Sequence, residues 1–473
     1  MKNILKEIEG KYPVDTVLVN GEQVWPYLRV AYNVQYVDKI SSQKGEKPLW
    51  AGLSFLGKLR RLPNILYGIR NWLGKYDYIA ISATNQRRPI SGKYFNRLLD
   101  PVIDKLGRGK VLYIEIPAPS LYPIASVYTN KVVCYDLLEL SAMIAEAFTL
   151  RRYKIENESI LEDINKDYDL SLDYLKVIKR FHARRAVFSF LFRMKKPKVV
   201  LLSCYYGLLQ SAIRAAKEYG AEVIEFQHGS IGEEHPAYNV YADLDKGSFP
   251  DYLAVFGKKE LETFGNSRFI QPQHVYPVGS FYLEYVKTNH IPSKNLVQRL
   301  KNYKVSIGVT LASTTESRLI EFVCQAAVLD RNICHLLIPR HPQEEHYSSV
   351  QLPDNVMIVK DENFYELMML VDFHATAYST CAIEAPSLGV QNILINVDGL
   401  AKRFYGNVLN DSRVTRFADT PEEFVSIANS FEKLDRDTLA KLDEDLIAVN
   451  YERNIQELLR RPPFLEQQSV SGE

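Results

Sequence analysis

The stretch KVVLLSCYYGLLQSAIRAAKEYGAEVIEFQHG, residues 198–229, contains a complete strand–helix–strand unit. Its two ends, Lys198–Ser203 and Glu222–Phe226, are short and rich in aliphatic and β-branched residues, as buried strands are. Between them, Leu208–Tyr219 is typical of a helix and is closed by Gly220. Two strands joined through a helix predict a parallel sheet with helices on its faces.

The same alternation continues in both directions from this unit. Before it, strands are predicted at Asp15–Val19, Tyr76–Ser82 and Lys110–Ile116, with a helical stretch around Gly92–Leu106. After it, a second series of predicted strands comprises Val305–Leu311, His335–Ile338, Val356–Val359, Phe373–Ala375 and Asn392–Ile395. We therefore expect an α/β protein with two doubly wound, Rossmann-like domains that face each other across a cleft.

A polar segment between the two series marks the expected domain boundary. It reads KTNHIPSKNLVQRLKNYKV, residues 287–305, and contains no clear strand. We expect a first domain over residues 1–285, a second over residues 286–462 and a disordered tail over residues 463–473. Because ligands of doubly wound sheets bind at the carboxyl ends of strands, the loops that follow strands are the candidate site.

The composition excludes several classes of protein. The chain of 473 residues is 46% hydrophobic and 24% charged, an ordinary globular balance, and its net charge of +1 gives no basis for nucleic acid binding. Its five cysteines include no C-x-x-C pair, which indicates reduced thiols rather than a disulfide frame or zinc site. The opening MKNILKEIEGKYPVD lacks the apolar run of a signal peptide, and no apolar stretch reaches the length of a membrane span. We expect a cytoplasmic protein.

Three polar loops follow predicted strands. The loop nearest the C-terminus is residues 378–380 (YST). Ser379 or Thr380 can cap the helix that follows, and the unpaired N–H groups and positive dipole of a helix start favour an anion. Glu384 lies one turn further and could hold the hydroxyls of a ribose. The alternative is a plain helix cap with an exposed glutamate.

The second loop, residues 340–342, reads Arg-His-Pro. Proline biases His341 toward an extended backbone, and a rigid histidine beside Arg340 suits a diphosphate or phosphodiester. The alternative is a structural loop histidine.

The third loop, residues 227–229, reads Gln-His-Gly. Gly229 allows a sharp turn or the close approach of a ligand. Glu225 shares a strand face with Gln227 and is not expected to be the direct partner of His228. His228 could act as a general base or donate a hydrogen bond to a phosphate. The alternative is a buried, satisfied histidine.

These loops occur in an order that resembles a known group of enzymes. QHG at 227–229, PVGS at 277–280, RHP at 340–342 and YST…E…G at 378–389 resemble bacterial capsule and surface-polysaccharide glycosyltransferases of the GT-B fold. The His-Pro and Ser-Thr pairs are similar to those of bacterial sialyltransferases and Kdo transferases, which use CMP-activated sugars. Teichoic-acid glycerophosphotransferases, which use CDP-glycerol, carry Trp-His-Gly where this chain has Gln-His-Gly. The resemblance covers residues 195–430.

The resemblance implies roles for particular residues. The first domain would hold the acceptor and the second the nucleotide donor. His341, Ser379 and Thr380 would contact the donor phosphate, Glu384 the ribose, and His228 would face the reaction centre. Further residues that the resemblance places near donor or acceptor are Gln227, Gly229, His235, Tyr238, Gly279, Ser280 and Arg340.

The general base is the open question within this resemblance. Sialyltransferases of this kind carry an acidic pair before a glycine, which has no secure counterpart here. Candidates are Glu22, Asp136 and the pair Glu233-Glu234, and we rank His228 first and Glu22 second. No Asp-x-Asp pair lies on a suitable loop, so we expect catalysis without a metal and no cofactor beyond the CMP-sugar donor.

The expected function is therefore transfer of an acidic sugar, such as Kdo, sialic acid or another nonulosonic acid, from a CMP-activated donor. The acceptor would be a growing glycan of a capsule, lipopolysaccharide or other surface polysaccharide, free or lipid-linked. Alternatives are a CDP-glycerol or polyol phosphotransferase, a UDP-sugar 2-epimerase-like enzyme, and a non-catalytic partner in polysaccharide assembly.

Two basic stretches bear on the location of the protein. Phe55–Lys75 contains five Lys or Arg residues and Lys176–Lys198 contains nine, and neither contains an acid. Basic segments with apolar and aromatic residues can lie on anionic membranes, which would place the protein at the inner membrane as a peripheral protein. The alternative is a solvated helix face packed on the core.

Overall fold

The computed structural model describes residues 4–40, 61–148, 153–232, 235–263, 267–290, 293–311, 315–339, 351–360 and 364–464. The chain forms two compact units. The first domain comprises Met1–Val255, Glu260–Pro277 and Glu452–Glu473, and the second comprises Phe256–Lys259 and Val278–Tyr451.

The domain limits differ from the expected boundary between residues 285 and 286. That boundary falls inside the continuous helix α10 (Phe281–Asn289), which packs against α13 (Phe364–Met368) of the second domain. Residues 452–462, expected in the second domain, have their contacts in the first.

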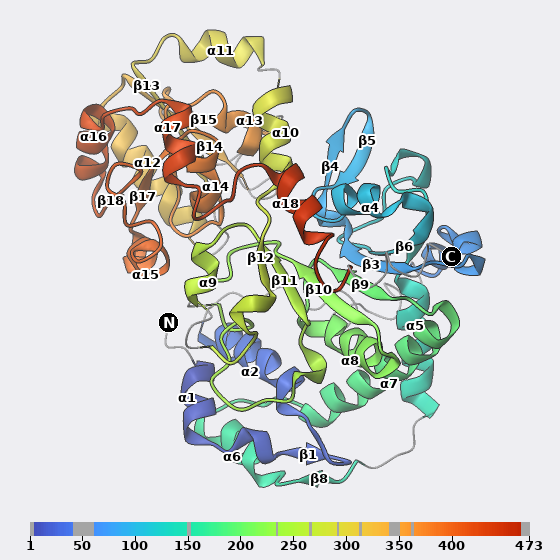
Figure 1. Cartoon of the computed structure of the whole chain (residues 1–473). Coiled ribbons are helices and arrows are strands. Elements are labelled where there is room, and N and C mark those ends of the chain that lie inside the picture. Colours follow the sequence, from blue (N-terminus) through green and yellow to red (C-terminus); the bar gives the residue numbers. More distant parts are fainter. Residues whose placement is uncertain are drawn as a thin grey trace. The chain divides into compact units, whose positions relative to one another are not determined.

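The first domain is built on a seven-stranded sheet with the order β12-β11-β10-β9-β3-β6-β7, in which all neighbouring strands are parallel (Figure 1). Its strands are β3 (Tyr78–Ala83), β6 (Val111–Ile116), β7 (Val132–Cys134), β9 (Val199–Leu202), β10 (Glu222–Phe226), β11 (Tyr252–Val255) and β12 (Val275–Pro277). Within this sheet the first strand is β3, and β6 and then β7 are added on one side of it. The chain then returns to the other side of β3 with β9, and β10, β11 and β12 follow outward. The prediction of a doubly wound parallel sheet is confirmed, and its strand order reverses between β3 and β9.

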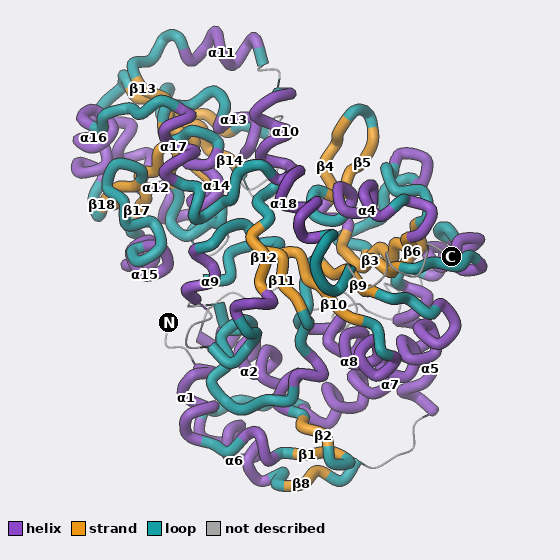
Figure 2. Tube along the Cα trace, viewed as in Figure 1, coloured by secondary structure: helices purple, strands orange, loops and turns teal. Residues whose placement is uncertain are grey.

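Helices cover this sheet. The helix α7 (Tyr174–Lys195) packs against α5 (Asp136–Phe148) and α8 (Gln210–Tyr219), and α7 and α8 lie side by side in Figure 2. Gly220 ends α8 in the left-handed conformation, at φ 93°, as the sequence predicted.

A small antiparallel sheet lies outside the main one and accounts for one incorrect prediction. The segment Asp15–Val19 is not a strand of the parallel sheet, because Val14–Thr16 forms a 3₁₀ turn. Only β1 (Leu18–Val19) is extended, and it pairs with β2 (Glu22–Gln23) and β8 (Ile155–Glu156). The helices around this sheet are α1 (Ile4–Lys11), α2 (Trp25–Ile40) and α6 (Ser159–Asp167).

The predicted helix around Gly92–Leu106 is also partly wrong. Only α4 (Asp100–Leu106) is helical, and before it β4 (Arg87–Ile90) and β5 (Lys93–Asn96) form a hairpin. Its two turn residues, Ser91 and Gly92, both have positive φ, the conformation that a two-residue hairpin turn of the primed type requires.

The second domain repeats the doubly wound pattern on a six-stranded parallel sheet with the order β15-β14-β13-β16-β17-β18. Its strands are β13 (Val305–Thr310), β14 (Ile333–Ile338), β15 (Val356–Ile358), β16 (Phe373–Ala375), β17 (Gln391–Ile395) and β18 (Thr415–Ala418). Its helices include α11 (Lys294–Leu300), α12 (Glu316–Leu329), α14 (Cys381–Ser387), α15 (Leu400–Tyr405), α16 (Pro421–Ser430) and α17 (Arg436–Leu442). The strand order reverses between β13 and β16.

Candidate functional site

The loop between β16 and α14 lies at the switch point of the second domain, where doubly wound sheets bind ligands. The hydroxyl of Tyr405 donates hydrogen bonds to the carbonyls of Tyr378 (3.1 Å) and Ser379 (2.7 Å). These bonds hold the loop in place. Ser379 is half-buried and Thr380 is exposed, so both hydroxyls lie at or near the surface at this edge.

The sequence predicted unpaired N–H groups at the start of α14, but several of these groups already have hydrogen-bond acceptors within the loop and helix. The hydroxyl of Ser379 accepts from the N–H of Cys381 (3.3 Å), whereas Thr380 makes no capping bond. The N–H groups of Ala382 and Ile383 already donate to the carbonyls of residues 379 and 380, each at 3.0 Å. The loop therefore offers an anion its hydroxyls rather than a set of unpaired helix N–H groups.

Glu384 lies one turn into α14, as expected, but its residue is only 6% exposed. The hydroxyl of Tyr365 donates to both carboxylate oxygens, at 3.1 and 3.3 Å. A direct contact between Glu384 and a ribose would require exchange of this hydrogen bond.

A buried histidine that the sequence analysis missed stabilises the same edge of the sheet. His374 on β16 is fully buried between Thr310 (2.6 Å from its Nε2) and the Asn392 side-chain oxygen (2.8 Å from its Nδ1). Burial lowers the pKa of His374 to about 4, so the ring is neutral. Asn392 in turn donates to the carbonyl of Ala382 in α14 (2.8 Å). The sequence signal for His374 was its place inside the predicted strand Phe373–Ala375, where a polar side chain is expected to be buried and hydrogen-bonded.

Several predicted residues lie outside the described part of the chain. They are Arg340 and His341 of the Arg-His-Pro loop and the candidate acidic pair Glu233-Glu234. Their roles stay predictions.

In the first domain, His228 is the second residue after β10, the strand between β9 and β11. Its Nε2 lies 3.4 Å from the Tyr206 hydroxyl, and the Arg97 side chain approaches its carbonyl at 3.5 Å. Burial and then the positive charge of Arg97 lower the pKa of His228 to about 4, and the Ser203 backbone opposes this shift in part. The ring is therefore neutral at pH 7 and can accept a proton, although a low pKa weakens it as a base.

A buried carboxyl group lies on β10, three residues before this histidine. Glu225 is fully buried, and one of its oxygens accepts from the Tyr238 hydroxyl (2.6 Å) and the Tyr205 N–H (3.2 Å). Its second oxygen is buried without a hydrogen-bond partner. Burial raises the pKa of Glu225 to about 8, so the group is largely protonated at neutral pH. No hydrogen bond joins Glu225 to His228 in the described residues.

Gln227 and Tyr238 were expected near the substrate, but the structure buries both. Gln227 is 1% exposed, and its amide donates to the carbonyl of Gly229 (2.8 Å) and to Glu260 (3.0 Å). Tyr238 is fully buried against Glu225. These two side chains build the interior beneath the loop and cannot touch a ligand in this conformation.

Glu260 is the second carboxyl group beside the loop, and the sequence analysis did not select it. Burial raises the pKa of Glu260 to about 7, and the hydrogen bond from Gln227 opposes that shift. Burial is the largest cause of the pKa shifts of Glu225, Glu260 and His228, so these shifts follow from the interior position of the three groups.

His235 is the second histidine. It is half-buried, and its ring lies against Tyr206 (5.7 Å between centroids) and Tyr238 (4.9 Å). Burial, followed by the charge of His228, lowers the pKa of His235 to about 3. Its ring therefore joins the aromatic wall beside His228.

The two acidic base candidates that the structure describes both have structural partners. Glu22 forms ion pairs with Arg185 (2.6 Å) and Arg214 (3.3 Å). Burial would raise the pKa of Glu22, but these arginines outweigh it and lower the pKa, which makes Glu22 a weak base. Asp136 accepts from the Asn64 amide (2.8 Å) and is 1% exposed.

The segment at Gly279 and Ser280 has a structural explanation. Gly279 has φ +80°, and a side chain there would overlap the carbonyl oxygen of Ala448. Ser280 precedes α10 but makes no capping bond through its hydroxyl.

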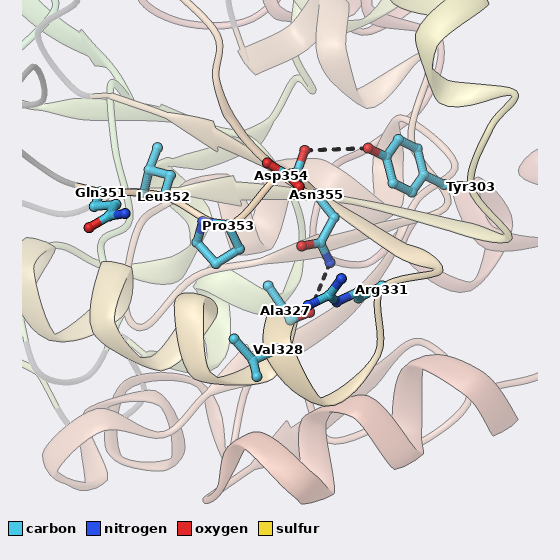
Figure 3. A pocket seen from close by; sticks show the side chains of 9 residues that line it. All are labelled: Tyr303, Ala327, Val328, Arg331, Gln351, Leu352, Pro353, Asp354 and Asn355. Atoms are coloured by element: carbon cyan, nitrogen blue, oxygen red, sulfur yellow. Dashed lines mark hydrogen bonds between the residues drawn. The ribbon is translucent and has the colours of Figure 1, made fainter.

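A pocket of about 410 Å³ lies elsewhere in the second domain (Figure 3). Its residues Tyr303, Arg331 and Asp354 precede β13, β14 and β15, so it is at the amino ends of these strands. The switch-point loop is at the carboxyl ends. The pocket is therefore at the opposite edge of the sheet from the candidate site.

Among the described residues, no group of three or more His, Cys, Asp or Glu side chains could hold a metal ion. No helix in the described ranges is both long and apolar enough to cross a bilayer.

Comparisons with known proteins define the class of fold. No family model matches this chain, and no curated protein is similar to it in sequence. A protein described as a UDP-N-acetylglucosamine 2-epimerase from Listeria monocytogenes has a TM-score of 0.52 at 8% identity, over 85% of this chain and 98% of that one. The glycosyltransferase of kitacinnamycin has a TM-score of 0.52 at 12% identity, over 82% and 99%. At these identities the similarity establishes the GT-B fold of two Rossmann-like domains.

Proposed function

We propose that this protein is a glycosyltransferase that uses a nucleotide-activated sugar, and that its donor is a CMP-activated acidic sugar such as Kdo or sialic acid. The acceptor is a growing surface glycan, free or lipid-linked. The GT-B fold, shared with the glycosyltransferase of kitacinnamycin, supports the general activity. The choice of CMP rests on the similarity of the loops at 227–229, 340–342 and 378–380 to those of CMP-sugar transferases.

The observation that carries this proposal is the switch-point loop of the second domain. Tyr405 holds the loop carbonyls, and the hydroxyls of Ser379 and Thr380 lie where doubly wound sheets bind nucleotides. We propose that these hydroxyls and His341 bind the donor phosphate, and that Glu384 holds the ribose once it exchanges its bond from Tyr365.

The reaction breaks the bond between the anomeric carbon and a phosphate oxygen, and CMP leaves with the bonding electrons. The acceptor hydroxyl forms the new bond to that carbon and loses its proton. Hydroxyl and cationic groups at the phosphate stabilise the departing charge. We propose that neutral His228 takes the proton, a role typically worth about 10²–10⁴-fold in rate.

A thermal-shift experiment with CMP, CDP, UDP and GDP tests this proposal. A nucleotide that binds only the folded state stabilises it by about 2.7 kcal/mol at 100 times its Kd, so the preferred nucleotide gives the largest shift. We expect CMP to give it, and the double variant Ser379→Ala/Thr380→Ala to lose it. The matched control is Ser430→Ala, whose hydroxyl bonds within α16. His228→Ala should keep the CMP shift and lose turnover of a CMP-sugar.

Other outcomes contradict separate parts of the proposal. A preference for CDP or UDP would contradict the assignment of a CMP-sugar as donor, but it would still support an enzyme that uses a nucleotide-activated substrate. No shift with any nucleotide would contradict the whole assignment. Equal loss of CMP binding and turnover in His228→Ala would make it a binding residue rather than a base.

A second candidate function is epimerisation of a UDP-sugar at C2. It is favoured by the fold similarity to the Listeria protein. Glu225 and Glu260 could exchange a proton with its substrate only if the loop that buries them opened. Incubation with a UDP-N-acetylhexosamine in deuterated water distinguishes the two. Deuterium at C2 without an acceptor would support the epimerase, whereas no exchange in the UDP-sugar, together with release of CMP from a CMP-activated sugar, would support the transferase.

A further inference from the structure

Two short 3₁₀ helices of the first domain present apolar side chains to solvent. They are η2 (Leu62–Leu66) and η3 (Ile69–Leu73), and neither contains a buried residue. Leu66 is 68% exposed and Leu73 is 88% exposed. The exposed apolar residues of this segment are Leu62, Leu66, Ile69 and Leu73. Four exposed large apolar side chains within twelve residues are the kind of feature that marks an interaction surface.

The end of α7, which is hydrogen-bonded to the end of η3, carries two more exposed apolar side chains. Phe190 and Met194 are four residues apart and therefore lie on one face of the helix. They are 67% and 52% exposed. The ammonium group of Lys195 donates to the carbonyls of Trp72 and Gly74, which ties the end of α7 to the end of η3. We call Leu62, Leu66, Ile69, Leu73, Phe190 and Met194 the apolar patch.

Cations without acidic partners lie in the same two segments. The sequence contains no Asp or Glu in residues 61–75 or 174–198. Arg184 in the middle of α7 is neutralised by Glu139 (2.7 Å). Four exposed cations in these segments, Arg70, Lys75, Arg193 and Lys196, lie close in sequence to residues of the patch, and none of the four forms an ion pair within the described ranges.

We propose that the apolar patch and these four cations dock the protein on an anionic lipid bilayer. Apolar side chains flanked by cations suit shallow insertion at the level of the headgroups, where anionic lipid attracts each Lys or Arg. A protein partner would have to supply a matching acidic rim, whereas an anionic bilayer presents that charge everywhere. The docking does not depend on the proposed activity.

Co-sedimentation of the full chain with vesicles tests this docking. We expect binding to vesicles of phosphatidylcholine with phosphatidylglycerol, little binding to phosphatidylcholine alone, and loss of binding at high salt. Each cation near an anionic surface contributes about fivefold in partitioning, so Arg70→Gln/Lys75→Gln should reduce it by about 25-fold. Leu73→Ser and Met194→Ser should also weaken binding, and both are exposed enough to leave folding intact.

Matched controls come from the second domain. Val328→Ser/Leu329→Ser removes two exposed apolar side chains, and Lys294→Gln/Lys301→Gln removes two exposed cations. Neither pair should change vesicle binding. Equal binding to both vesicle types, or equal effects of patch and control variants, would overturn the proposal. Self-association that Leu73→Ser abolishes, without vesicle binding, would instead assign the patch to a second copy of the chain.

Discussion

His335 and His374 are two fully buried histidines of the same sheet with opposite surroundings. Both ring nitrogens of His374 have hydrogen-bond partners, whereas neither nitrogen of His335 has one. His335 lies against the ring of Phe424, 6.0 Å between centroids. A buried polar group without partners costs stability, so His335 weakens the domain at a position where an apolar side chain would fit.

We expect His335→Leu to raise the free energy of unfolding by about 1–3 kcal/mol at pH 7, because it removes an unsatisfied buried group. Burial lowers the pKa of His335 to about 4 from its ordinary 6.5. The unfolded chain therefore binds more protons between these values, and the native protein loses stability as pH falls from 6.5 to 4. The advantage of the variant should grow over that window, as denaturant titrations at pH 7 and pH 5 would measure.

The matched variant is His374→Leu. It leaves the Asn392 oxygen without its donor, so it should destabilise the protein at pH 7. If both variants change stability in the same direction, hydrogen-bond satisfaction does not distinguish these sites.

At the scale of elements, two turns contain a glycine with positive φ, and they differ in the space around that glycine. Gly279 and Gly92 have φ of +80° and +75°. A side chain at Gly279 would overlap the Ala448 carbonyl, whereas one at Gly92 would meet nothing within 4 Å. The backbone conformation is the same, so only the surroundings differ.

We expect Gly92→Ala to cost about 1–2 kcal/mol, the conformational cost of a left-handed residue. Gly279→Ala should cost more, because the backbone at Ala448 must also move. Thermal unfolding of the two variants measures the difference. Equal losses would show that Ala448 can move without cost.

At the scale of the whole molecule, the chain returns to the first domain at its end. Phe464 is 3% exposed and lies against Tyr78 of β3 (6.5 Å between centroids). The Tyr276 hydroxyl donates to the carbonyl of Pro462 (3.4 Å). The last described residues are thus part of the first domain, although nearly all of that domain precedes residue 278.

Truncation after Tyr451, the last residue of the second domain, should therefore destabilise the first domain. The loss follows from the apolar contacts of Leu458 and Phe464, which are 2% and 3% exposed. Limited proteolysis with mass spectrometry would locate the new cleavage sites within the first domain. The control is Glu452→Gln, which removes only an exposed ion pair with Lys105 and should change little. New cleavage sites only in the second domain would contradict this division of the chain.

Nine of the thirteen parallel strands were predicted from the sequence, because strands buried on both faces have a recognisable local pattern, whereas β7, β11, β12 and β18 were missed. Val199–Leu202 is a continuous hydrophobic run, and Val305–Thr310 is buried throughout and rich in β-branched residues, so local patterns identify both without knowledge of the fold. The β4–β5 hairpin was missed because its turn requires positive φ at two successive residues. The pair Ser91-Gly92 can adopt this conformation, but it is not a sequence that predicts it.

The candidate site was predictable only in its location. Residues at the ends of predicted strands were selected, and Ser379, Thr380 and His228 do lie there. Which side chains are buried depends on segments that pack from elsewhere in the chain. Tyr238 and Gln227 are covered for that reason, and Glu225 and Glu260 acquire raised pKa values in the same way.

The sequence by itself determined two alternating series of strands and helices, and hence two doubly wound sheets, because burial and local propensity act over a few residues. Only the tertiary structure decided the solvation of each polar side chain. In the folded chain Glu22 forms ion pairs with two arginines, Glu225 is buried and Leu73 is exposed. These differences arise because the solvation of a side chain depends on neighbours that are distant along the chain.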